Sequence, residues 1–66
     1  MQLYEVTFEH KALTGPLVVE LRATTPERAE LRVRYYAFHE YRTAEFLDEG
    51  TCAVVEVTAA RRAGER

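Results

Sequence analysis

The sequence contains a single cysteine, Cys52, so the chain cannot form an internal disulfide. A domain of this length buries only about 60% of the surface that its unfolded chain exposes, and such domains often rely on a disulfide, a metal or a partner subunit. Long apolar runs are also missing: the longest have four residues, far fewer than the ~20 of a membrane-spanning helix. These absences leave a metal or a partner subunit as further sources of stability.

An excess of either charge is missing too. Nine basic and eleven acidic residues give a net charge of −2, without the basic excess that is typical of nucleic-acid-binding domains. The basic residues gather in two places, the segment Glu27–Arg42 and the tail Arg61–Arg66. An unpaired thiol and an N-terminal segment interrupted by Glu5 and Glu9 favour a cytoplasmic protein without a secretory signal.

Three segments alternate apolar and polar residues as β-strands do. In the first two, Leu3–Glu9 and Leu17–Ala23, the inward sets are Tyr4, Val6 and Phe8, then Leu17, Val19, Leu21 and Ala23. Turn residues between them predict an antiparallel hairpin with a loop over His10–Pro16. The third strand, Thr51–Ala59, has Ala53, Val55 and Val57 on one face and Cys52, Val54, Glu56 and Thr58 on the other.

A helix is predicted from Pro26 to about Tyr41. Thr25 caps its free N–H groups, Pro26 suits the first helical position, and Glu27 complements the positive end of the helix dipole. The order ββαβ with a right-handed crossover predicts an α+β fold: a three-stranded, mainly antiparallel sheet in the order 2-1-3 with one helix on one face. We expect one domain over residues 1–60 and a flexible basic tail over 61–66.

The segment Arg42–Gly50 has two interpretations. It either extends the helix after an irregularity or forms a short second helix that ends at Gly50.

The uncovered face of the predicted sheet is acidic. It carries Glu5, Glu9, Glu20 and Glu56 against a single Arg22, while the strand aromatics Tyr4 and Phe8 share the core face with Val6. RNA-recognition sheets expose aromatic residues for base stacking, and an acidic face repels phosphate. RNA binding through the sheet is therefore disfavoured.

The predicted helix carries two apolar stripes. The first faces the sheet and consists of Ala29, Val33, Tyr36, Ala37 and Ala44. The second, almost opposite, consists of Leu31, Tyr35 and Phe38, where a surface helix is normally polar. Either the Arg42–Gly50 segment folds over this second stripe, or the stripe binds another subunit or partner. The small size of the core favours the partner, and a homodimer in particular.

Four arginines lie along the same helix: Arg28, Arg32, Arg34 and Arg42. Arginine interleaved with tyrosine suits a nucleic-acid groove, through phosphate pairing and base stacking, and the tail arginines would add to it. The same residues also serve as anchors in protein interfaces. Glu27, Glu30 and Glu40 offer these arginines ion pairs within the helix, which weakens the nucleic-acid interpretation.

Residues for catalysis or metal binding are scattered. His10, His39 and Cys52 occur singly, without the close spacing of a zinc site, and three strands with one helix form no obvious cleft for a Cys–His pair. The three glycines stand apart, so a glycine-rich phosphate loop is missing. The sequence predicts no catalytic residue, no metal and no cofactor.

The run from Val18 to Ala29, VVELRATTPERA, resembles the strand-to-helix passage of small ββαβ accessory proteins of phages and plasmids. That resemblance implies a mobile-element or host-interaction setting and carries over no site residue. The sequence thus predicts a non-catalytic protein-interaction module that forms a homodimer through Leu31, Tyr35 and Phe38. A nucleic-acid-binding accessory protein is the alternative.

Overall fold

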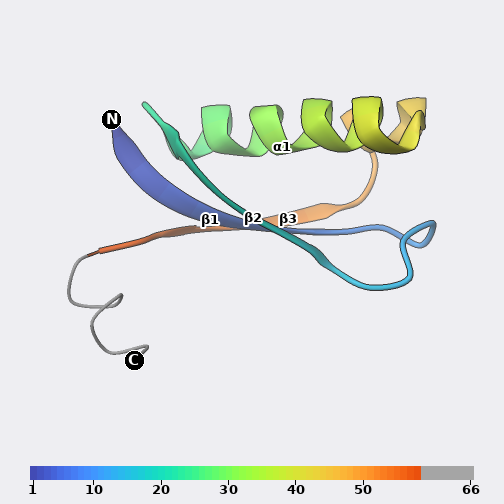
Figure 1. The fold of residues 1–66 in the computed structure, drawn as a ribbon, viewed down its shortest axis with the longest axis horizontal. Coiled ribbons are helices and arrows are strands. Elements are labelled where there is room, and N and C mark those ends of the chain that lie inside the picture. The colour runs from blue at the N-terminus through green and yellow to red at the C-terminus, as the bar shows by residue number, and fades with distance from the viewer. Residues whose placement is uncertain (59–66) are drawn as a thin grey trace.

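The structure, a computed structural model, describes residues 1–58. Three strands, β1 (Gln2–Glu9), β2 (Leu17–Ala23) and β3 (Thr51–Glu56), accompany the helix α1 (Pro26–Tyr41) and the short 3-10 helix η1 (Ala44–Leu47). The central strand β1 pairs antiparallel with both others, in the order β2-β1-β3. Because α1 lies along one face of this sheet (Figure 1), the predicted α+β fold is confirmed. The predicted tail lies outside the described residues.

Local interactions set both ends of α1. The Thr25 hydroxyl accepts a hydrogen bond from the Arg28 amide at 3.1 Å, and Pro26 occupies the first turn. At the other end Arg42 adopts the left-handed conformation, with φ of 55°, which a continuing helix does not allow. The segment after α1 therefore forms a separate 3-10 turn that ends at Leu47, before Gly50.

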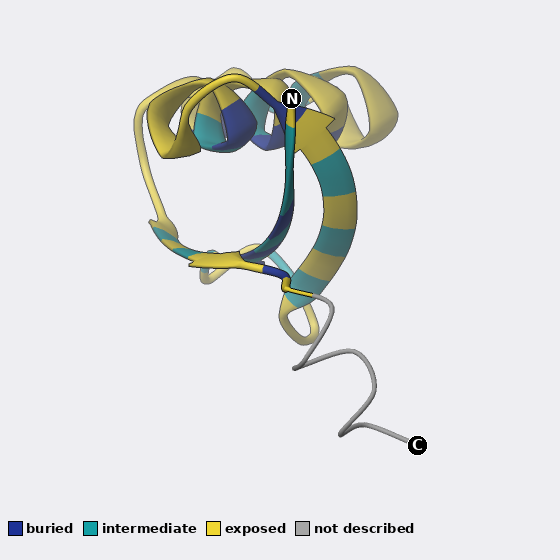
Figure 2. Cartoon of the chain, turned by 90° about the vertical axis from the view of Figure 1, so that its left-hand side faces the viewer, coloured by how far each residue is buried: buried dark blue, intermediate teal, exposed yellow. Residues whose placement is uncertain are grey.

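The core lies between β1 and α1. β1 contributes Tyr4, Val6 and Phe8, and α1 contributes Ala29, Val33 and Ala37, whose small side chains bring the helix close to the sheet. Figure 2 shows the buried stretches of α1 on the side of the helix that faces the sheet. Phe46 of η1 completes the core and is 1% exposed. Phe46 was not predicted to be in the core, because it lies in a segment without a periodic pattern.

The faces of β3 differ from the prediction. Glu56, Val54 and Cys52 are the partners of Tyr4, Val6 and Phe8, so these three residues of β3 lie on the helix side. Ala53 and Val55 lie on the uncovered face instead, and Val55 is 46% exposed. For these residues the prediction was wrong because both faces of the strand are apolar, and only the pairing with β1 decides which one turns inward. Val57, just beyond the observed end of β3 at Glu56, is buried as predicted.

Two members of the predicted sheet-facing stripe are also placed differently. Tyr36 is 49% exposed, because it lies on the flank of α1, about 60° around the helix from Val33. Ala44 belongs to η1, beyond the end of α1, and is exposed. Ala29, Val33 and Ala37 face the sheet as predicted.

Candidate protein-interaction face

The second apolar stripe lies on the side of α1 that faces away from the sheet, and we call it the outer face. Leu31 and Tyr35 are 51% and 50% exposed, whereas Phe38 is half-buried. Leu47 of η1 adds a further apolar side chain that is exposed. The segment after α1 inserts Phe46 into the core and leaves Leu31 and Tyr35 in contact with solvent.

Two shallow hollows lie at the two ends of the outer face. The N-terminal hollow is lined by Glu27, Glu30, Leu31, Arg34 and Leu47. The C-terminal hollow is lined by Phe38, His39, Arg42 and Ala44. Each hollow thus contains one apolar residue of the stripe. The two hollows differ in charge. In the first, Arg34 pairs with Glu30 and the Glu27 carboxylate has no ion pair within residues 1–58, so this hollow is acidic, whereas the second contains the Arg42 guanidinium.

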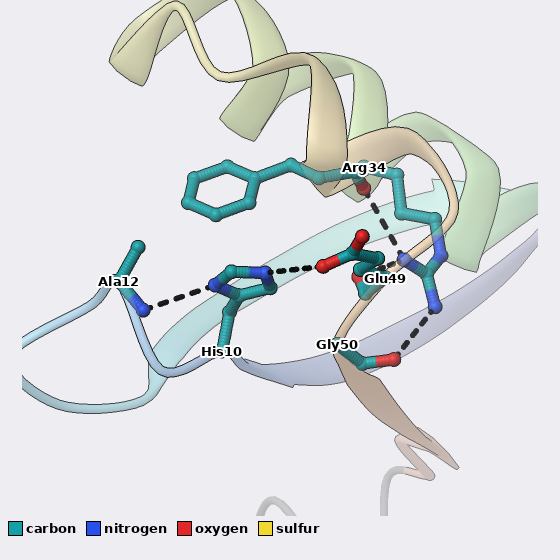
Figure 3. Close-up of polar contacts among 6 residues, drawn as sticks. His10, Ala12, Arg34, Glu49 and Gly50 are labelled. Carbon is teal, nitrogen blue, oxygen red and sulfur yellow. Dashed lines mark hydrogen bonds and ion pairs between the residues drawn. The ribbon is translucent and has the colours of Figure 1, made fainter.

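The side chain of Arg34 is 12% exposed and acts as a clamp between α1 and the segment 46–50. Nη1 donates hydrogen bonds to the carbonyl oxygens of Phe46 and Glu49 at 3.2 and 2.6 Å, and Nη2 donates to Gly50 at 3.2 Å (Figure 3). Nε donates to the Glu30 carboxylate at 3.0 Å, which is an i,i+4 ion pair of the kind expected within this helix. The guanidinium also lies 5.4 Å from the centre of the Phe8 ring. This side chain fastens the 46–50 segment to α1.

His10 fastens the same segment to the hairpin loop, and its side chain is 6% exposed. Nδ1 accepts a hydrogen bond from the Ala12 amide at 3.0 Å, so the proton of the neutral ring lies on Nε2. Nε2 is 3.5 Å from the Glu49 carboxylate (Figure 3). The ring also packs edge-on against Phe46. Neither clamp was predicted from the sequence; the i,i+4 spacing of Glu30 and Arg34 was the one signal for the Arg34 clamp.

The other three arginines are exposed but dispersed. Arg28 and Arg32 line a hollow beside Met1 and Thr24 at the start of α1, and Arg32 donates to the Arg22 carbonyl at 3.3 Å. Arg42 lies at the opposite end of a helix about 24 Å long. Arg34 is turned inward, so three of the four arginines predicted to contact nucleic acid are exposed, two near the start of α1 and one at its end.

The residues considered for chemistry belong to different elements of the fold. His10 is in the hairpin clamp, Cys52 is on β3 below α1, and the His39 ring packs beside Phe38 on α1. Within residues 1–58, His, Cys, Asp and Glu form no group of three or more that could hold a metal ion. The described part of the chain also has no helix that is long and apolar enough to cross a membrane.

Cys52 gives a prediction on pH. Burial raises the pKa of its thiol; the Arg34 guanidinium opposes this shift and the Glu30 carboxylate adds to it. Because the pKa is higher in the folded than in the unfolded state, this contribution to stability is full below the ordinary thiol pKa and is lost as the pH rises through the folded value. We expect the free energy of unfolding, measured with urea, to decline at alkaline pH, and to decline less in the Cys52→Ala protein than in the wild type. An identical alkaline decline in both proteins would contradict this.

Comparison of the chain with protein-family models, with curated proteins and with solved structures finds no match.

Proposed function

We propose that this protein is a non-catalytic interaction module that pairs with a second copy of itself through the outer face of α1. The half exposure of Leu31 and Tyr35 carries this proposal, because the opposite side of the same helix is fully occupied by the sheet. Exposed apolar patches on small domains mark interaction sites. Burial of the exposed half of each side chain would contribute about 1 kcal/mol, four times in a symmetric dimer.

Charge supports a second copy as the partner. The outer face has an acidic hollow at one end and a basic hollow at the other. A partner of uniform charge would match only one of these ends. A second copy brings both, and a two-fold dimer uses the same surface on each subunit.

The face is small, which sets the expected affinity. It is about 24 Å long and about 10 Å wide, whereas stable interfaces bury about 800 Å² on each partner. We therefore expect a dissociation constant in the micromolar range, so the dimer should be visible only in concentrated samples.

The test replaces the two most exposed residues of the stripe, as Leu31→Glu with Tyr35→Glu. Sedimentation equilibrium should show a dimer for the wild type and a monomer for this variant. Both positions are half exposed, so the variant should fold, with the circular dichroism of the wild type. The melting temperature of the wild type should rise with protein concentration, and that of the variant should not.

A matched control carries the same charges on the sheet, as Val18→Glu with Val55→Glu, since these valines are 55% and 46% exposed. This control should still dimerise. If the control becomes monomeric while the helix variant stays dimeric, the subunits pair through the sheet and the proposed face is wrong. A folded wild-type monomer at millimolar concentration would overturn the dimer altogether.

A further inference from the structure

The order of residues along the outer face is symmetric about its middle. Leu31 and Phe38 are seven residues apart, and Glu27 and Arg42 flank them at equal distances in sequence. The midpoint of the apolar pair and the midpoint of the charged pair therefore coincide, between Arg34 and Tyr35. The apolar pair spans about 10 Å of the helix and the charged pair about 22 Å.

We infer that the two copies pair with their helices antiparallel, about a two-fold axis beside Tyr35. This register places Leu31 opposite the partner's Phe38 and Glu27 opposite the partner's Arg42. The acidic hollow of one subunit then receives the basic end of the other, and each occurs twice by symmetry. The inference rests on the proposed function, because it specifies the geometry of that same face.

Two features of the structure suit this register. Glu27 and Arg42 are both exposed, and neither has an ion pair within residues 1–58. Arg34, which lies near the axis and would otherwise meet its own copy, already donates to three carbonyl groups and to Glu30. Tyr35 is then left to face the partner's Tyr35. A parallel pairing would instead bring each charge against its own copy.

The test exchanges the two charges, using Glu27→Arg and Arg42→Glu as separate proteins and together in one chain. Each single variant places like charges at both ends of the antiparallel dimer, so we expect each to dimerise at least tenfold more weakly than the wild type at low salt. An equal mixture of the two single variants restores both pairs and should form a heterodimer about as tight as the wild-type dimer. The doubly exchanged chain should recover self-association, and high salt should reduce all these differences.

The outcomes separate the register from the function. If the wild type dimerises and Leu31→Glu with Tyr35→Glu abolishes the dimer, the face is correct. If, in that case, the mixture binds no more tightly than either single variant alone, the antiparallel register is wrong. A parallel dimer would show a different pattern, in which neither single variant self-associates more weakly than the wild type, and the doubly exchanged chain pairs more tightly with the wild type than with itself. Failure of the wild type to dimerise refutes the proposed function itself.

Discussion

Arg34→Met is expected to lower the free energy of unfolding by about 3 kcal/mol. The guanidinium satisfies the carbonyl oxygens of Phe46, Glu49 and Gly50, and methionine keeps the aliphatic stem without any donor. Hydrogen bonds to a charged group contribute about 1.5–3 kcal/mol each, and their loss frees the 46–50 segment that carries Phe46 into the core. A domain this small lies near the lower end of the range of domain stabilities, about 5 kcal/mol, so the urea midpoint should fall by about half.

Arg32→Met is the matched control for that experiment. It makes the same replacement two residues away, at an exposed arginine with one hydrogen bond, to the Arg22 carbonyl. Exposed substitutions of this kind usually change stability by no more than about 0.5 kcal/mol. Equal losses for Arg34→Met and Arg32→Met would show that the 46–50 segment does not depend on the Arg34 clamp.

Gly50→Ala is expected to destabilise the domain by roughly 2–4 kcal/mol. Gly50 has a φ of +91°, which disfavours any side chain, and an added Cβ would lie 2.7 Å from Phe8 Cε1 and 2.8 Å from the Glu9 carbonyl oxygen. Phe8 is fully buried and cannot move aside, so β3 would have to shift against β1. Thermal unfolding should show a melting temperature lowered by more than about 10 °C.

Gly15→Ala separates this effect from a general glycine effect. A Cβ at Gly15 would have no atom within 4 Å, and its φ is not in the positive range. We expect this change to be neutral or to stabilise by up to about 1 kcal/mol, because it restricts the unfolded chain. A Gly50→Ala protein as stable as Gly15→Ala would contradict the close packing of Gly50, directly before β3, against Phe8.

The sequence alone determined the elements whose signals are local. Period-two alternation identified the inward residues of β1 and β2, since successive side chains of a strand point to opposite faces. The Thr25 cap and Pro26 marked the start of α1 because they act within one turn. The ββαβ order with a right-handed crossover was enough for the sheet order, as few topologies connect such elements without crossing.

Only the tertiary structure decided features that depend on what meets across the chain. The inward face of β3 follows from its register on β1, because Cys52 and Val54 are no more apolar in pattern than Ala53 and Val55. Phe46 became core and Arg34 and His10 became clamps because the segment after α1 returns across the end of the sheet. The sequence found Leu31, Tyr35 and Phe38 as a second stripe by helical period alone. Their exposure was decided by where that returning segment packs, since burial depends on neighbours that are distant in sequence.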